Sequence, residues 1–219
     1  MKKYTMTPSG YVAYLEAVSR RIRENKDYVT QLDAATGDGD HWANLNSGFE
    51  KVLQKKDSMK QMTFQQLFRS CGMDLMSGVG GSSGVLYGSA YLAAAKAAAQ
   101  METLDAAGLS QVLSAELEAI MARGNAKPGF KTMIDPLYQG TEAMKAALAE
   151  GKTDAEVLEA LQNGAREGME ATAGMEAVRG RACYQADKGV GHLDPGAVTM
   201  YYELDLLAAC MKEGGEADA

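Results

Sequence analysis

The chain has 219 residues, of which 46% are hydrophobic and 23% are charged, and this composition is typical of a globular protein. Its formal net charge of −7 argues against a nucleic-acid partner, because phosphate backbones need a basic face. No apolar run reaches membrane-spanning length and the three cysteines (Cys71, Cys183 and Cys210) lie far apart, so we expect one cytoplasmic domain over residues 1–219 and no membrane partner.

Apolar residues recur with helical spacing along most of the chain, and no segment alternates long enough to predict a strand. Thr7 and Pro8 mark the start of the first helix, and capping boxes at Thr63 and Thr153 mark two later starts. The pattern predicts an all-α protein. The eight expected helices cover about residues 8–22, 42–53, 63–77, 84–99, 110–123, 135–149, 153–172 and 194–212.

Short connections favour antiparallel neighbours, so the second, fourth, sixth and eighth helices would all begin at one end of the molecule. The loops that precede these four helices are the richest of the chain in glycine, aspartate and hydroxyl residues: 37–41, 80–84, 127–132 and 191–196. Helix N-termini carry free N–H groups and positive dipole ends, so this end would favour anions. Aspartates at such an end make sense if a divalent metal joins them to a phosphorylated ligand.

Three of these aspartates, Asp33, Asp38 and Asp40, lie close together in the sequence, and two glycines between them allow a tight turn. Carboxylates are hard oxygen ligands, which suit Mg²⁺ better than zinc. A turn with an aspartate helix cap is the plainer alternative. An EF-hand is excluded because its fifth and twelfth positions would be Trp42 and Phe49.

The loop 79–84, Val-Gly-Gly-Ser-Ser-Gly, resembles a phosphate cradle, since small residues allow close approach and hydroxyls add donors. It is not a Walker A loop, because no Lys-Ser/Thr pair closes it. The Arg-Gly-Arg-Ala run at 179–182 brings guanidinium groups that can neutralise a phosphoryl group during transfer, although most arginines are simply solvated.

The two histidines of the chain, His41 and His192, both lie in the candidate loops. This placement favours contact with a phosphate or nucleotide as much as a structural role, and it disfavours zinc because the nearby ligands are oxygen. Lys131 is similarly ambiguous, since it can contact a phosphate or be a solvated loop residue.

Longer motifs connect these loops in order along nearly the whole chain. They are Leu32-Asp33-x-x-x-Gly37-Asp38-Gly39-Asp40-His41-x-x-Asn44, Gly80-Gly81-Ser82-Ser83-Gly84-x-Leu86-Tyr87-Gly88, Arg123-Gly124-x-Ala126-x-Pro128-Gly129-x-Lys131-Thr132-Met133-x-Asp135, Arg179-Gly180-Arg181-Ala182 with Tyr184, and Gly191-His192-x-Asp194-Pro195-Gly196-Ala197. Together they resemble the L subunit of dihydroxyacetone (glycerone) kinase.

The resemblance implies an eight-helix antiparallel up-and-down barrel with a nucleotide site at one end. It implies bound ADP, with two Mg²⁺ ions between its phosphates and Asp33, Asp38 and Asp40. A phosphohistidine-bearing M subunit would convert the ADP to ATP, whose γ-phosphoryl group would pass to dihydroxyacetone on a separate K subunit. Arg181 would assist this transfer, and a homodimer is compatible with the resemblance. The residues expected at the nucleotide are His41, Trp42, Ala43, Asn44, Ser82, Ser83, Gly124, Met133, Arg181, Asp194, Pro195 and Gly196.

Two residues depart from the family pattern. Trp42 stands where a glycine usually follows the histidine, and Phe130 replaces an acidic residue. Trp42 could stack near the base, line a docking face or belong only to its helix stripe. The departures leave open an ATP-dependent kinase subunit for another ketose or a different acceptor such as a fatty acid, and a nucleotide-loaded module that regulates a partner.

Overall fold

A computed structural model describes residues 3–214, and ten α-helices make up most of this part of the chain. The helices are α1 (Pro8–Glu24), α2 (Lys26–Thr36), α3 (His41–Leu53), α4 (Lys56–Met59), α5 (Phe64–Gly78), α6 (Gly81–Ala97), α7 (Ala106–Gly124), α8 (Ile134–Ala149), α9 (Asp154–Ala171) and α10 (Pro195–Gly214). Two short 3₁₀ helices cover Thr172–Gly174 and Arg181–Tyr184. None of the helices within residues 3–214 has the length and apolar character to cross a membrane.

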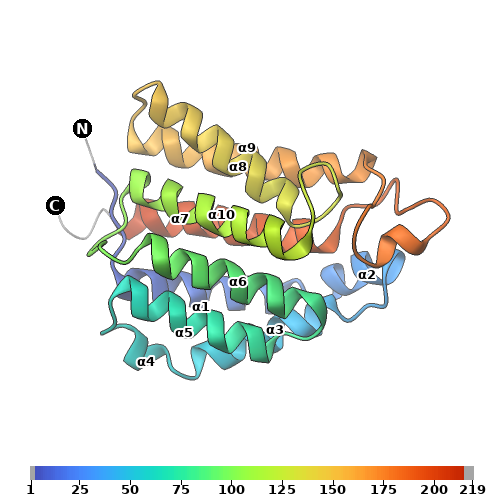
Figure 1. Cartoon of the computed structure of the whole chain (residues 1–219), viewed down its shortest axis with the longest axis horizontal. Coiled ribbons are helices and arrows are strands. Elements are labelled where there is room, and N and C mark those ends of the chain that lie inside the picture. Colours follow the sequence, from blue (N-terminus) through green and yellow to red (C-terminus); the bar gives the residue numbers. More distant parts are fainter. Residues whose placement is uncertain (1–2, 215–219) are drawn as a thin grey trace.

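The eight long helices form a closed antiparallel ring (Figure 1). Each of the seven long helices after α1 packs on the long helix before it, and α10 packs back on α1; the seven are α3, α5, α6, α7, α8, α9 and α10. Their starts follow the expected caps: the Thr7 side chain accepts the N–H of Gly10, and the capping boxes at Thr63 and Thr153 are both formed. The predicted all-α barrel is therefore confirmed, with helix ends shifted by a few residues.

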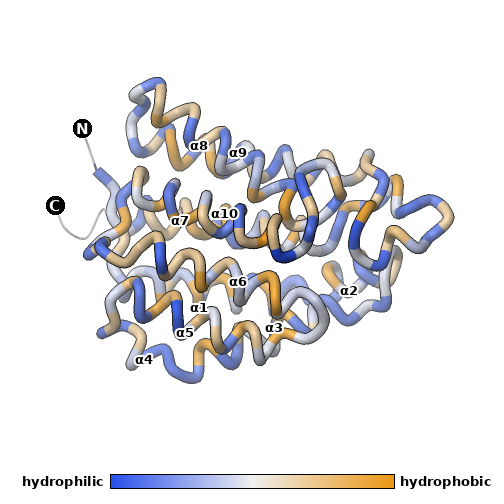
Figure 2. Tube along the Cα trace, viewed as in Figure 1, coloured by the Kyte–Doolittle hydropathy of each residue, from blue (hydrophilic) through white to orange (hydrophobic). Residues whose placement is uncertain are grey.

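One hydrophobic cluster fills the ring from side to side. Near α1 and α5 it contains the rings of Tyr11, Phe64 and Phe68, with Tyr11 in edge-to-face contact with both phenylalanines. Phe68 is fully buried, so its truncation to alanine would cost about 3–5 kcal/mol. In Figure 2, hydrophilic residues cover α4, whereas the long helices alternate between hydrophilic and hydrophobic residues, because each buries only one face.

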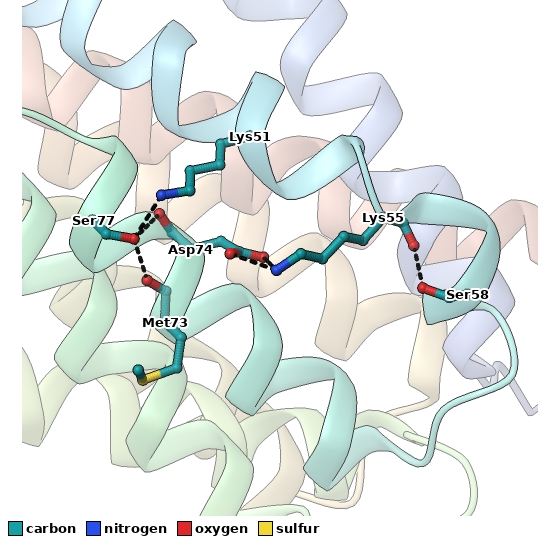
Figure 3. Close-up of polar contacts among 6 residues, drawn as sticks. All are labelled: Lys51, Lys55, Ser58, Met73, Asp74 and Ser77. Carbon is teal, nitrogen blue, oxygen red and sulfur yellow. Dashed lines mark hydrogen bonds and ion pairs between the residues drawn. The ribbon is translucent and has the colours of Figure 1, made fainter.

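Polar contacts between α3 and α5 support the ring on the side shown in Figure 3. Lys55 follows α3, and its Nζ lies 2.8 Å from both carboxylate oxygens of Asp74 on α5. The Nζ of Lys51 donates to the hydroxyl of Ser77 at 2.8 Å. These contacts hold the last turns of α5, which lead directly into the loop before α6.

The helix α2 was not expected. Its buried residues, Val29, Asp33 and Thr36, are helically spaced, but only one of them is apolar, so the sequence signal is weak. In Figure 1, α2 lies at the end of the ring away from the chain termini. Asp33 therefore lies in the last turn of a helix and not in a loop.

Candidate functional site

A cavity of about 770 Å³ opens at the α2 end of the ring. Residues from the first turns of α3, α6, α8 and α10 all line it, as the antiparallel order of the helices predicts. The volume falls within the range of about 300–1,000 Å³ that small-molecule sites usually have. Four helix N-termini therefore converge on one space, where their N–H groups and dipoles favour an anion.

The three aspartates lie together on the wall of this cavity. One carboxylate oxygen from each of Asp33, Asp38 and Asp40 lies within 4.8 Å of the others. The backbone N–H of His41 donates to Asp33 Oδ2 at 2.9 Å, and a Cβ at Gly37 would lie only 2.5 Å from Asp33 Oδ1. Three clustered carboxylates supply the hard oxygen ligands that Mg²⁺ prefers, so the residues present fit this ion.

Arg181 approaches this cluster from the far part of the chain. Its Nη2 lies 2.5 Å from Asp38 Oδ2, with the two side chains 65% and 38% exposed. Arg181 begins the 3₁₀ helix Arg181–Tyr184, which lies over the cavity. The guanidinium thus offsets part of the carboxylate charge and lies beside the space that an anionic ligand would fill.

Lys131 is buried, with 1% of its surface exposed, and is not a solvated loop residue. Its Nζ donates to the carbonyl of Thr172 and, at 2.5 Å, to the carbonyl of His192. Burial lowers the pKa of Lys131, against the opposing effect of the nearby Asp194 carboxylate. Lys131 therefore holds together the two ends of the segment 172–192.

The same segment is attached to the rim of the cavity on two sides. Arg179 Nε donates to the carbonyl of Asn125 at the end of α7, at 3.0 Å. Gln185 Nε2 donates to the carbonyl of Ala35 in α2, at 3.1 Å. These two contacts flank Arg181 in the sequence, one on each side, and so hold it over the cavity.

His41 and Asn44 bring the first turn of α3 to the cavity. The Nε2 atom of His41 lies 3.0 Å from Thr199 Oγ1 on α10. Burial lowers the pKa of His41, although the nearby Asp33 and Asp40 carboxylates oppose the shift. A Cβ at Gly80 would lie 2.3 Å from Asn44 Oδ1, and only glycine therefore lets the start of α6 approach α3 this closely.

Two further carboxylates shape the starts of α8 and α10. The carboxylate of Asp135 accepts the N–H groups of Gly129 and Thr132, at 2.5 and 2.7 Å, and so closes the loop before α8. Asp194 Oδ2 accepts the N–H of Ala197 at 2.8 Å. Burial raises the pKa of Asp194 to about 7, although this hydrogen bond opposes the rise.

All but two of the residues expected at the site line the cavity. The expected residues that line it are Asp33, Asp38, Asp40, His41, Asn44, Ser82, Ser83, Gly124, Met133, Arg181, Asp194, Pro195 and Gly196.

The two exceptions, Trp42 and Ala43, are not among the lining residues. The indole N–H of Trp42 donates to the carbonyl of Ile22 at 2.9 Å, and Lys26 Nζ lies 4.8 Å from the centre of its ring. The placement of Trp42 therefore agrees with the helix-stripe interpretation, in which it joins α3 to α1. His192 is exposed and contributes its carbonyl to Lys131.

An apolar part of the cavity wall was not anticipated from the sequence. Val85 and Leu86 on α6 and Ile120 on α7 line the cavity beside Met133. Leu86 stands in one of the motifs quoted above, but Ile120 is part of an ordinary apolar stripe, which cannot be told from core. The cavity thus has a charged side at the aspartates and an apolar side between α6 and α7.

The comparisons with known proteins agree with this geometry. The DAK2 domain model matches residues 35–209. The chain is 37% identical to the ADP-binding subunit DhaL of the PTS-dependent dihydroxyacetone kinase of Lactococcus lactis, over 92% of this chain and 97% of that subunit. It is 39% identical to the corresponding subunit of PEP-dependent dihydroxyacetone kinase 1 of Listeria innocua, over 84% and 87% of the two chains.

A solved structure shares the fold. The dihydroxyacetone kinase from C. freundii, in complex with AMP-PNP and Mg²⁺, matches with a TM-score of 0.70 and 26% identity. The match covers 90% of this chain and 33% of the other, so the chain spans about a third of that kinase. The family model and the relatives of equal length show that the chain belongs to the DAK2 domain family, together with the DhaL subunits of dihydroxyacetone kinases.

Proposed function

We propose that this chain, as one domain over residues 1–219, is the nucleotide-carrying subunit of a dihydroxyacetone kinase. The observation that carries the proposal is the meeting of three aspartate carboxylates and four helix N-termini on one cavity. Such a site suits a metal-bound diphosphate or triphosphate. The names of the relatives, which are ADP-binding subunits, support the same ligand.

The two sides of the cavity suit the two parts of a nucleotide. Ser82 and Ser83, at the start of α6, offer hydroxyl and backbone donors to phosphate oxygens. The apolar side between Leu86 and Ile120 offers a surface for the base. Asp33, Asp38 and Asp40 would hold two Mg²⁺ ions against the phosphates. When bound, these ions would supply charge neutralisation at the phosphoryl group that is transferred.

Phosphoryl transfer needs positioning and charge neutralisation more than a side-chain nucleophile. Arg181 suits this task because its guanidinium already contacts one of the candidate metal ligands, and the attached segment 172–192 keeps it there. We assign it the catalytic role of neutralising charge on the phosphoryl group. The remaining donors of the cavity orient the nucleotide, so the chemistry depends on a partner that brings the acceptor.

Exposed hydrophobic side chains, some of them on the segments that form the cavity wall, support docking of such a partner. In the described part of the chain, the large exposed hydrophobic residues are Tyr28, Met73, Met76, Val178, Tyr184 and Val190. They come from α2, from the last turns of α5 and from the segment 172–192, and α2 and this segment also contribute residues to the cavity wall. Apolar side chains that stay exposed in this way often mark an interface.

We propose two partners at this mouth. A dihydroxyacetone-binding K subunit would receive the γ-phosphoryl group, and a phosphohistidine-bearing M subunit would regenerate it on ADP. Both must approach the terminal phosphate from the open side, so they would bind in turn. We place the complex in the cytoplasm, and the cysteines, which are all free thiols, agree with a reducing compartment.

Reconstitution tests this proposal. The chain is mixed with purified K and M subunits, dihydroxyacetone and the phosphotransferase proteins that charge the M subunit from phosphoenolpyruvate. Formation of dihydroxyacetone phosphate is followed with phosphoenolpyruvate or ATP as the phosphate source. We expect turnover with phosphoenolpyruvate that depends on all three proteins, and loss of turnover in Asp38→Asn. Asp57→Asn is the matched control, because Asp57 is an exposed aspartate on α4.

Efficient turnover with free ATP and no M subunit would identify a kinase subunit of the ATP-dependent type instead. Partner binding that survives Asp38→Ala with Asp40→Ala, in a complex that transfers no phosphate, would identify a regulatory module.

A further inference from the structure

The buried side chain of Lys131 joins both ends of the segment 172–192 to the loop before α8. Its Nζ donates to the carbonyl of Thr172 at the start of the segment and, at 2.5 Å, to the carbonyl of His192 at its end. In Figure 1 this segment is the orange loop beside α2. One ammonium group therefore closes the segment that carries Arg181 into a loop.

This arrangement is costly for Lys131 itself. The two acceptors of its ammonium are carbonyls, which carry no net charge, whereas a buried cation is usually paired with a carboxylate. Its backbone also lies in the left-handed region, with a φ of 59°, and this conformation is unfavourable for residues other than glycine. Costs of this kind gather at functional sites, so the position of Lys131 indicates a role beyond stability.

Two further contacts join the inner part of the segment to the same loop. The backbone N–H of Val178 donates to the carbonyl of Phe130 at 3.2 Å. Gly189 lies against the lysine stem: a Cβ at this position would lie 3.2 Å from Lys131 Cε, and its φ of 71° favours glycine. Arg181 lies between Val178 and Gly189 in the sequence, so both of its flanks are supported by Lys131 or by the residue before it.

We propose that Lys131 is a positioning residue for phosphoryl transfer, because its hold on the segment 172–192 fixes the place of the Arg181 guanidinium over the cavity. The proposal rests on the proposed function, since Lys131 acts through Arg181. A misplacement of about 1 Å in a reacting site can lower the rate roughly 100-fold. Lys131 also lines the cavity, so the alternative is direct contact between its third ammonium proton and a phosphate of the nucleotide.

A double-mutant cycle separates the two roles. Lys131→Met removes the ammonium, and in the reconstituted kinase we expect kcat to fall roughly 100-fold. Lys145→Met is the control, because Lys145 is an exposed lysine on α8. In an Arg181→Ala background, Lys131→Met should lower neither kcat nor the affinity for ADP with Mg²⁺ any further, whereas independent effects would multiply. A further loss of either quantity in that background would overturn the proposal, and a loss of ADP affinity would identify the direct phosphate contact.

Amide hydrogen exchange reads the attachment of the segment without a partner subunit. The N–H of Gly191 donates to the carbonyl of Ala173 at 2.8 Å, and so reports on the two ends of the segment, whereas the N–H of Val178 reports on its inner part. Both amides should exchange at least about 10-fold faster in Lys131→Met than in the wild type, because the segment opens more often. Lys145→Met should leave them unchanged. Equal protection in the wild type and in folded Lys131→Met would overturn the proposal.

If Lys131→Met does not fold, Gly189→Ala tests the same contact from the segment. Its added methyl group would press on the lysine stem, and we expect a lower kcat that is not additive with Arg181→Ala. Gly174→Ala is the matched control, because no atom of the described residues lies within 4 Å of a Cβ at Gly174. Equal kcat in the two glycine variants would contradict the proposal. A wild-type chain that transfers no phosphate would refute the proposed function, whereas transfer that is unaffected in Lys131→Met would refute only the role of Lys131.

Discussion

The guanidinium of Arg181 lies 2.5 Å from the carboxylate of Asp38, although the two residues are far apart in the sequence. Both side chains are substantially exposed, and such pairs contribute little to stability, about 0–1 kcal/mol. The segment that carries Arg181 is nevertheless attached to α2, to the end of α7 and to the loop before α8. The arginine is held in place, yet its ion pair adds little to the stability of the fold. This combination indicates a role in binding and chemistry.

Replacement of Arg181 should therefore reduce transfer and leave the fold intact. We expect Arg181→Ala to lower kcat in the reconstituted complex by on the order of 10³-fold, as loss of a transition-state arginine does. The free energy of unfolding should change by less than about 1 kcal/mol. Arg166→Ala removes an exposed arginine of α9 and is the control. A kcat close to that of the wild type would refute the catalytic assignment.

Trp42 should matter for stability and not for the nucleotide. Trp42→Phe removes the hydrogen bond to the carbonyl of Ile22, which should cost about 1 kcal/mol in urea unfolding. The affinity for ADP, measured by calorimetry, should not change, because the side chain does not line the cavity. A clear loss of ADP affinity in a fully folded variant would mean that Trp42 reaches the ligand.

The pair of Lys55 and Asp74 should stabilise the ring near α5. Lys55→Met leaves the buried carboxylate of Asp74 without its cation, and we expect a loss of about 1–3 kcal/mol, moderated because Lys55 is half exposed. Lys60→Met removes a lysine from an exposed pair with Asp57 and should change stability by less than about 0.5 kcal/mol. Equal effects of the two substitutions would show that the α3–α5 contact is energetically unimportant.

Stability should fall as the pH rises from about 4.5 to 8. Burial raises the pKa of both Glu116 and Glu203 from 4.5 to about 8, so the folded chain keeps protons that the unfolded chain releases. Each group should lower the free energy of unfolding by up to about 1.4 kcal/mol per pH unit within this window, and by nothing further above it. Urea unfolding from pH 5 to 9 measures the slope.

Glu116→Gln with Glu203→Gln is the control for this effect. The double variant cannot ionise at these positions, so its stability should fall less steeply over the same range. The smaller slope that remains should come from groups such as Asp194, whose pKa is also raised by burial. An identical slope in the two proteins would contradict the assignment.

Local signals predicted most of the fold. Thr7, Thr63 and Thr153 start their helices because side-chain caps act within one turn, and such caps can be read from the sequence. The helix α2 was not predicted, because its buried face is mostly polar. Asp105, which accepts the N–H of Gly108, starts α7 several residues before the apolar stripe does, so the expected start was late.

The candidate site was predictable where it depends on helix starts, and less so where it depends on long-range contacts. The loops before α3, α6, α8 and α10 meet because antiparallel order requires it. The burial of Lys131 depends on carbonyls of residues far along the chain, which no local pattern reveals. Glu203 lies within an apolar stripe of α10, and its partner Tyr87 can be recognised only when α6 and α10 are placed together.

The nucleotide content of the purified protein tests the central claim most directly. The wild-type chain, denatured and extracted, should release ADP in an amount comparable to the protein, or should bind added ADP only when Mg²⁺ is present. Asp38→Ala should contain no ADP and bind none, whereas Asp57→Ala should behave as the wild type. Full retention of nucleotide in folded Asp38→Ala, or a wild-type chain that binds no ADP with Mg²⁺, would contradict the assignment of the three aspartates.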